Sequence, residues 1–284
     1  YLDHVLRRAV EEGIDPVKAV QLCTINPAQW FKLDEYIGSI SPGKCADIVL
    51  LNNLENFEVE TVIVNGTTDW APRTAYTYTY PQYGKSVRIK RLQPDDFAIK
   101  LDRAKRARII GLIAGELLTE EIVEKISGID TGRDILKIAV VERHHYSGNI
   151  GVGFVKGFGL KTGAVASSIA HDSHNIVVIG TNEEDIAFAC NRLKELGGGI
   201  VLCTGSEVIC ELALPIAGLM SDKGLDDVAQ KQRELEERIA EMGCKLQAPF
   251  ITLSFLALPV IPKLRITDKG LVDAEKQKIV DIFV

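Results

Sequence analysis

The stretch Ile176–Cys203, IVVIGTNEEDIAFACNRLKELGGGIVLC, decides the fold of the larger part of this chain. Two short apolar runs, Ile176–Ile179 and Ile200–Cys203, enclose Asn182–Leu196, where apolar residues recur at helical spacing. Acidic residues in the first turn suit the positive end of a helix, and a run of glycines ends it. The apolar face of this helix consists of Ile186, Ala189, Cys190 and Leu193. The stretch therefore predicts a strand–helix–strand unit with a crossover long enough to join parallel strands.

Further apolar runs extend this unit in both directions. Strands are predicted at Arg108–Ala114 and Ile135–Val141, and a charged, solvent-facing helix at about Asp226–Met242. The very apolar stretch Pro249–Pro262 is expected to be buried. The predicted fold class is α/β with some α+β character, in a domain that covers residues 85–284.

A smaller domain is predicted at residues 1–66. Its predicted helices begin near Leu2, Pro16 and Pro27, and its predicted strands cover Ala46–Leu51 and Val59–Val64. Residues 67–84 contain four tyrosines and little aliphatic sequence, so we expect a linker there. The chain lacks an initial methionine and opens within a helical pattern, which favours a piece of a longer protein.

Composition excludes several classes of function. The net charge of −6 gives no bulk attraction to nucleic acid or to an anionic membrane, and neither partner is expected. No apolar run reaches the roughly 18 residues that a membrane-spanning helix needs, and no signal peptide is expected. The six cysteines form no C-x-x-C pair and predict reduced residues in a cytoplasmic protein.

A polar cluster interrupts the apolar stretch Ala164–Gly180. It consists of His171, Asp172, Ser173, His174 and Asn175. Burying such side chains together is costly unless they are satisfied or bind something. Two imidazoles and a carboxylate suit a metal ion, and they equally suit a polar ligand, because histidine exchanges protons near neutral pH. A mutually satisfied structural cluster is the third interpretation. We expect the cluster to be buried and to face a ligand.

A second candidate cluster follows the predicted strand Ile135–Val141. Arg143, His144 and His145 come directly after its end. Strand ends in α/β proteins often carry working residues, although a solvated loop with incidental histidines is the alternative. These side chains are expected to form a second wall of the same site.

Other motifs of defined chemistry do not occur in this sequence. The glycines between Gly148 and Gly163 lack the spacing of a dinucleotide fingerprint or a phosphate-binding loop. We expect tight turns there, in which the backbone approaches a neighbour closely. Neither the zinc deaminase signature nor His-Glu-x-x-His is present.

Two stretches resemble known families. LRRAVEEGIDPVKAVQLCTINPAQWFKLDEYIGSISPGKCADIVLLNN, Leu6–Asn53, resembles the closing helices of an amidohydrolase barrel and its return to a small β domain, with the pattern Pro-Gly-x-x-Ala-Asp at Pro42 to Asp47. ERHHYSGNIGVGFVKGFGLKTGAVASSIAHDSHNIVVIG, Glu142–Gly180, is similar to the C-terminal domain of bacterial and archaeal adenine deaminases. The stretches LPIAGLMSD and PFITLSFLALPVIPKLRITDKGL extend the second resemblance.

The resemblance implies hydrolysis of adenine to hypoxanthine and ammonia in purine salvage, by a water that manganese or iron activates. The family's metal ligands match no position of this sequence, so none is assigned here and no tightly bound metal is expected. The implied partners are adenine, the missing barrel segment and further copies of the chain. The residues expected to act on the substrate are His171, Asp172 and His174, and those expected to bind it are Ser173, Asn175, Arg143, His144 and His145.

Two alternatives remain open on the sequence. The chain could be a structural or oligomerisation domain of a metal-dependent cyclic amidohydrolase, with no catalytic residue of its own. It could also belong to an amidohydrolase that acts on a cyclic amide, which the first stretch permits and the second disfavours. In each case the apolar faces of residues 1–66 are expected to promote association or exchange of elements between copies.

Overall fold

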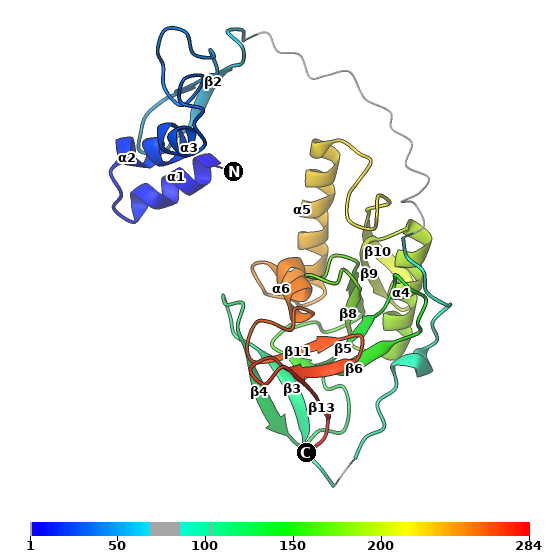
Figure 1. Ribbon diagram of the computed structural model, residues 1–284. Helices are drawn as coiled ribbons and strands as arrows, with labels where there is room; N and C mark the ends of the chain where they lie inside the picture. The colour runs from blue at the N-terminus through cyan, green and yellow to red at the C-terminus, as the bar shows by residue number, and fades with distance from the viewer. Residues whose placement is uncertain (1, 69–85, 103) are drawn as a thin grey trace. The chain divides into compact units, whose positions relative to one another are not determined.

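The computed structural model describes residues 2–68, 86–102 and 104–284, and shows a mixed α/β fold (Figure 1). The chain divides into two compact units, residues 1–78 and 79–284. The predicted linker at 67–84 lies, from residue 69 onward, outside the described residues. Among the described residues, no helix is both long and apolar enough to cross a membrane.

The first unit is built from short helices and a two-stranded antiparallel sheet. The elements are α1 (Leu2–Glu11), α2 (Pro16–Cys23), α3 (Ile25–Trp30), β1 (Ile48–Leu51) and β2 (Val59–Ile63). At the start of α2, the Asp15 carboxylate accepts a hydrogen bond from the Lys18 backbone N–H, and Pro16 takes the first helical position. The predicted helices and strands of this unit are therefore confirmed.

The second unit is built on an eight-stranded sheet with the order β10-β9-β7-β8-β5-β6-β3-β4. The strands are β3 (Ala107–Leu112), β4 (Thr119–Glu124), β5 (Ile135–Val141), β6 (Ile150–Lys156), β7 (Ala164–Ser167), β8 (Ile176–Gly180), β9 (Gly199–Thr204) and β10 (Glu207–Ala213). The helices are η1 (Pro94–Phe97), α4 (Glu183–Leu196), α5 (Leu225–Glu241) and α6 (Pro249–Leu256). A three-stranded sheet adds β11 (Leu264–Thr267), β12 (Gly270–Asp273) and β13 (Lys278–Val280).

The predicted strand–helix–strand unit is present as β8, α4 and β9. Asn182 caps α4 by accepting a hydrogen bond from the Asp185 backbone, and Gly197 ends it with a left-handed φ of 78°. Strand β7 lies between β8 and β9 and is antiparallel to both, so the two predicted strands run parallel without pairing. The crossover therefore spans one intervening strand that the sequence analysis did not predict.

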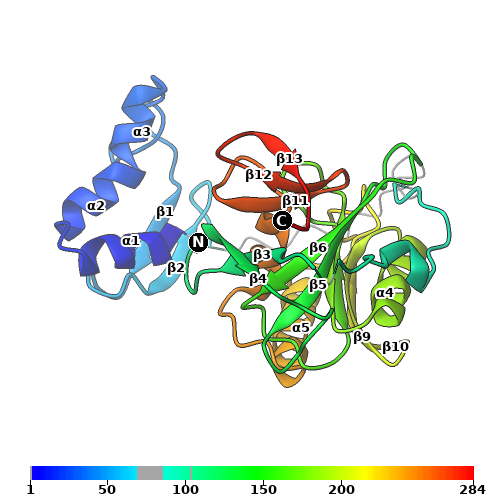
Figure 2. The same ribbon diagram turned by 90° about the horizontal axis from the view of Figure 1, so that it is seen from below.

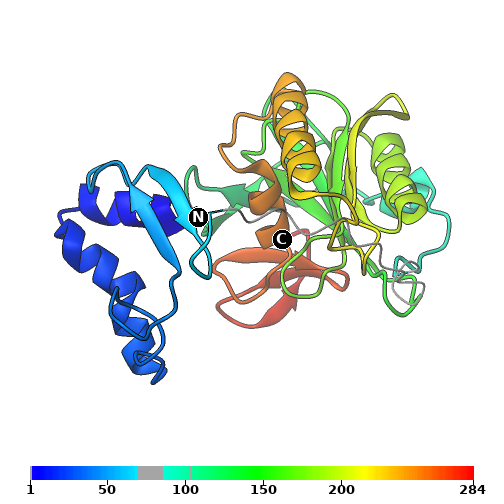
Figure 3. The same cartoon turned by 90° about the horizontal axis from the view of Figure 1, so that it is seen from above.

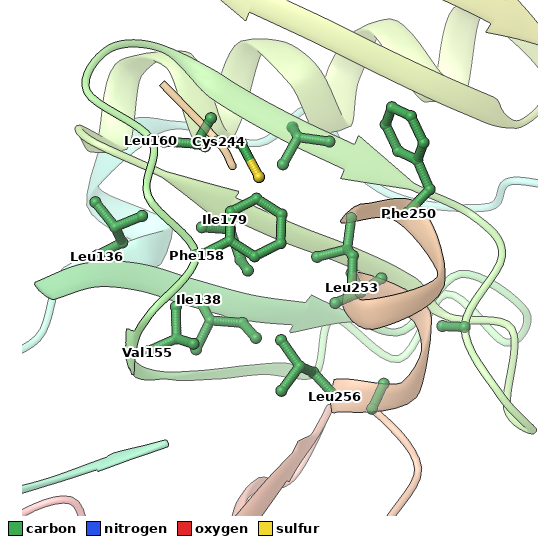
Figure 4. Close-up of a cluster of buried hydrophobic side chains, with 14 of the residues drawn as sticks. Leu136, Ile138, Val155, Phe158, Leu160, Ile179, Cys244, Phe250, Leu253 and Leu256 are labelled. Atoms are coloured by element: carbon green, nitrogen blue, oxygen red, sulfur yellow. The ribbon is translucent and has the colours of Figure 1, made fainter. Parts of the chain in front are cut away.

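Each face of the large sheet carries its own core. Helix α4 and the segment before η1 pack on one face, and α5, α6 and the β11–β12 hairpin pack on the other (Figure 3). Figure 4 shows α6 turning Leu253 and Leu256 toward Ile138 and Phe158 in the second core. The expected burial of Pro249–Pro262 is confirmed for the inward face of α6 and is wrong for Ile251, Val260 and Pro262, which are exposed.

The glycine-rich stretch is a strand, β6, followed by turns, where only turns were predicted. The three-stranded sheet packs against β6 (Figure 2). A Cβ on Gly151 would lie 1.9 Å from the Thr267 carbonyl oxygen, and one on Gly153 would lie 2.9 Å from Leu271 Cδ2. The expected close approach of backbone is therefore real, and the neighbour is the chain's own hairpin.

Candidate functional site

The two polar clusters of the sequence lie at one end of the large sheet. Strands β5 and β8 are antiparallel, and Val141, the last residue of β5, pairs with Ile176, the first residue of β8. The β5–β6 loop, residues 142–149, and the β7–β8 loop, residues 168–175, therefore meet at the same edge. The sheet itself brings together clusters that are separated along the chain.

The β7–β8 loop explains why polar residues interrupt an apolar stretch. Strands β7 and β8 are buried throughout, and the polar residues form the connection between them. Asn175 is buried, the two histidines are half-buried, and Asp172 and Ser173 are exposed. The expected burial of the whole cluster is therefore wrong for Asp172 and Ser173 in this chain.

Helix α6 contacts His171, and the His171 ring in turn lies beside that of His174. The His171 ring centroid lies 4.6 Å from that of Phe255 and 6.0 Å from that of His174, and the His171 backbone N–H donates to the Ser254 carbonyl. The His174 Nδ1 atom is buried and has no hydrogen-bond partner among the described residues. A buried polar atom of this kind is costly unless a ligand or water satisfies it.

Burial lowers the pKa of His174, and the charges of His171 and Arg143 lower it further, while Asp172 acts in the opposite direction. The imidazole is therefore neutral near pH 7. A neutral imidazole has one nitrogen that donates a hydrogen bond and one that accepts. This is the state that can receive a proton from a bound molecule.

Glu142 organises the β5–β6 loop. Its carboxylate accepts hydrogen bonds from the backbone N–H groups of His144, His145 and Ser147 and from the Ser147 hydroxyl. Partial burial alone would raise the pKa of Glu142, but these hydrogen bonds outweigh it and bring the pKa to about 2. The loop is therefore folded around the Glu142 carboxylate, which is negatively charged at neutral pH.

One hydrogen bond joins the two loops directly. His144 Nε2 donates to the Ser173 carbonyl over 2.8 Å, which fixes the proton of this imidazole on Nε2. His145 and Tyr146 are exposed beside it. The structure thus brings His144 together with the cluster from the β7–β8 loop.

Arg143 and Asn175 lie beneath the loops. Arg143 is 1% exposed, and its guanidinium donates to the carbonyls of His174, Ser86 and Ala217. The Asn175 side chain accepts a hydrogen bond from the Arg143 backbone N–H over 3.3 Å. Burial lowers the pKa of Arg143 to about 10, which leaves it charged at neutral pH.

Comparison with known proteins agrees with the resemblance of both stretches. Residues 2–68 match the amidohydrolase family, and residues 115–278 match the adenine deaminase C-terminal domain. The chain is 49% identical over 283 residues to adenine deaminase from Archaeoglobus fulgidus, which covers 99% of this chain and 49% of the relative. This chain belongs to the adenine deaminase family.

Other relatives in the family show the same coverage. Adenine deaminase from Clostridium botulinum (strain ATCC 19397 / Type A) is 42% identical over 100% of this chain and 50% of its own length. Adenine deaminase from Methanococcoides burtonii is 40% identical over 99% of this chain and 49% of its own length. The chain therefore spans about half the length of the curated relatives it matches.

The family implies a divalent metal, but the described residues do not form a site for one. No three His, Cys, Asp or Glu side chains within the described ranges gather closely enough to hold an ion. The His171 ring packs at a tilt against Phe255, and the Glu142 carboxylate already accepts hydrogen bonds from backbone N–H groups of its loop. We therefore derive no chemical step through a metal at this end of the sheet.

Three residues of this end were missed by the sequence analysis. Glu142 directly follows the predicted strand Ile135–Val141 but was not named as a candidate, and its carboxylate accepts hydrogen bonds from the loop that follows it. Phe255 and Ala217 reach the site from segments that are distant in sequence. Only the tertiary fold places them beside the histidines.

Proposed function

We propose that this chain is part of an adenine deaminase that hydrolyses adenine to hypoxanthine and ammonia. Membership of the family over both matched regions supports the reaction. We further propose a manganese or iron ion held outside this chain, a homo-oligomer, and a role in purine salvage in the cytoplasm. In this proposal, the two loops at the edge of the sheet contact the purine.

The observation that carries the site is the neutral, half-buried His174 with its unpartnered Nδ1. Deamination releases ammonia, so the amino nitrogen of adenine must gain a proton as its bond to carbon breaks. An imidazole that is neutral near pH 7 can take a proton from the attacking water and return it to that nitrogen. We assign this proton transfer to His174 and His171, with Asp172 raising the pKa of His174.

The remaining residues of the two loops hold the purine in place. His144 presents a ring fixed by Ser173, and His145 and Ser173 are exposed beside it. Hydrogen-bonding groups at a loop edge suit the ring nitrogens of a base, which accept or donate along one plane. Asn175 stabilises this arrangement, because its side-chain oxygen accepts a hydrogen bond from the Arg143 backbone N–H.

The proposal is tested by His171→Asn and His174→Asn in the full-length protein that contains this chain. Loss of a general acid–base group lowers turnover by about 100-fold or more. Gln247→Asn, at an exposed position before α6, is the control and should retain turnover. Unchanged kcat and KM for adenine in both histidine variants would assign the cluster a structural role, in agreement with the oligomerisation alternative.

The location of the metal is tested on the 284-residue chain itself. Ammonia release from adenine is measured with manganese added, and bound metal is determined in the same sample. We expect neither turnover nor bound metal, because the described residues provide no metal site. Turnover by this chain would instead place the catalytic metal on the histidines of these two loops.

A further inference from the structure

A third loop lies at the same end of the sheet. Ala213, the last residue of β10, pairs with Gly199, the first residue of β9. Ser167, the last residue of β7, pairs with Ile200. The loop that follows β10, residues 214–222, therefore starts beside the β7–β8 loop, and it contains a turn closed by the bridge between Ile216 and Met220.

The Arg143 guanidinium spans these two loops. Nε donates to the carbonyl of His174 in the β7–β8 loop, and Nη2 donates to the carbonyl of Ala217 over 3.1 Å. Nη1 donates to the carbonyl of Ser86 over 3.2 Å. Because the guanidinium is a rigid planar fork, the position of one carbonyl fixes the position of the other.

The Arg143 guanidinium packs tightly against Gly218 of the third loop. A Cβ on Gly218 would lie 2.8 Å from Arg143 Nη1 and 3.0 Å from its Cζ. Ser168, at the base of the β7–β8 loop, donates to the Gly218 carbonyl over 2.6 Å and accepts from the Gly199 N–H over 2.7 Å. The hydrogen bond from Ser168 to Gly218 therefore joins the same two loops independently of Arg143.

Two of the three residues whose carbonyls Arg143 binds have a left-handed backbone. The φ angle is 50° at His174 and 58° at Ala217. Residues other than glycine adopt this conformation at a cost, and such conformations concentrate at functional sites where the surroundings enforce them. Among the described residues no carboxylate lies within salt-bridge distance of Arg143; three carbonyls accept hydrogen bonds from its guanidinium, and the charge of nearby Glu142 favours its charged form.

We propose that Arg143 is a positioning residue, which fixes the His171–Asn175 cluster against residues 214–222 and makes this third loop a wall of the purine site. The inference rests on the proposed function of the histidine cluster. Arg143 acts through the peptide of His174 and does not touch the substrate. Met220, whose side chain is 56% exposed, is the apolar residue that the third loop offers to this wall.

The test compares two buried cations in the full-length protein: Arg143, in the loop after strand β5, and Lys137, on β5 itself. Arg143→Lys and Arg143→Met remove the fork at the site. Lys137→Met removes a buried cation, 3% exposed, which donates to the Phe97 carbonyl and pairs with Glu183. Lys137 lies near the other end of the same strand, so its loss tests destabilisation alone.

We expect both Arg143 variants to lower kcat/KM for adenine by about 100-fold, because displacement of a reacting group by about 1 Å has that effect. Lys137→Met should stay within about threefold of the parent at a temperature where thermal melts show every variant folded. Gly218→Ala, which drives a methyl group into the guanidinium, should reproduce the Arg143 defect. Methylguanidinium added to Arg143→Ala should restore part of the activity.

A second readout does not depend on turnover. In NMR spectra of the 284-residue chain, Arg143→Lys should shift the ring resonances of His174 and His144, whereas Lys137→Met should leave them in place. Parental kinetics and unshifted rings in Arg143→Lys would overturn the positioning role. An equal loss of kcat/KM in Lys137→Met would also overturn it, since a general loss of stability would then be the cause.

The two proposals fail in different ways. If His171→Asn and His174→Asn lower kcat/KM but Arg143→Lys does not, only the positioning role of Arg143 is wrong. If the histidine variants also keep parental kinetics, the proposed function of the cluster is wrong as well.

Discussion

At the scale of single residues, the charge on His174 depends on its nearest neighbours. His171 lowers the pKa of His174 and Asp172 raises it, in addition to the dominant lowering by burial. His171→Asn should therefore raise the pKa of His174, and Asp172→Asn should lower it further. The midpoints are measured by NMR titration of the histidine ring protons. Glu195→Gln, on the exposed side of α4, should leave the midpoint of His174 unchanged. Shifts of the same sign in His171→Asn and Asp172→Asn would contradict the opposite effects of these two neighbours on the pKa of His174.

The lowered pKa of His174 also affects stability. The unfolded chain binds a proton at this position near the ordinary value of 6.5, before the folded protein does. The contribution of the neutral ring to the free energy of unfolding is complete above pH 6.5. It is lost as the pH falls through the pKa of His174 in the folded protein. His174 therefore favours the unfolded state under mildly acidic conditions.

Glu142 gives a second pH-dependent prediction at this scale. Its folded pKa of about 2 lies below the ordinary value of 4.5, so its contribution is complete above pH 4.5 and is lost as the pH falls toward 2. Glu142→Gln should lower the free energy of unfolding at pH 7 by on the order of 2 kcal/mol, because the N–H and hydroxyl donors of the loop lose a charged acceptor. Urea unfolding at several pH values measures both the loss and the weaker acid dependence.

The matched control is Glu237→Gln, an exposed carboxylate on α5. It should change the free energy of unfolding by less than about 0.5 kcal/mol. Equal acid sensitivity in the parent and in Glu142→Gln would show that the loop does not depend on this carboxylate.

At the scale of elements, local patterns predicted what depends on local sequence. Helix α4 and strands β5, β8 and β9 each carry their own apolar pattern, and they were predicted. Strand β6 was not, because its glycines are explained only by the hairpin of residues 264–273 packed against it. The polar loops were recognised as candidates, but their meeting depends on the pairing of Val141 with Ile176, which no local pattern encodes.

The packing of that hairpin on β6 gives the prediction at this scale. Gly151→Ala places a methyl group 1.9 Å from the Thr267 carbonyl oxygen, so the strand and the hairpin must separate. We expect a loss of roughly 3 kcal/mol in the free energy of unfolding, typical of severe overpacking. Chemical denaturation measures it.

Gly224→Ala serves as the control, since its nearest atom, Asp227 Oδ2, is 3.6 Å away. At this helix N-cap we expect a loss below about 1 kcal/mol. Equal stabilities of the two variants would mean that β6 and the hairpin do not pack as closely as described.

At the scale of the whole molecule, the first unit presents much apolar surface. Trp30 and Ile40 are each 83% exposed, and Phe31 is 69% exposed. The same unit has a hollow of about 860 Å³ with an apolar lining that includes Leu6, Val20, Ile48 and Leu51. Large apolar side chains exposed to this extent, together with an apolar hollow, favour association.

The 284-residue chain should therefore self-associate through the first unit. Static light scattering should give a mass that rises with concentration above that of one chain, because association removes apolar side chains from water. Trp30→Ser combined with Ile40→Ser should shift this rise to concentrations about thirtyfold higher, since each of the two buried side chains contributes on the order of 1 kcal/mol. Val260→Ser, at a position 65% exposed in the second unit, should leave the rise where it is. A mass of one chain at every concentration would show that this surface does not drive association.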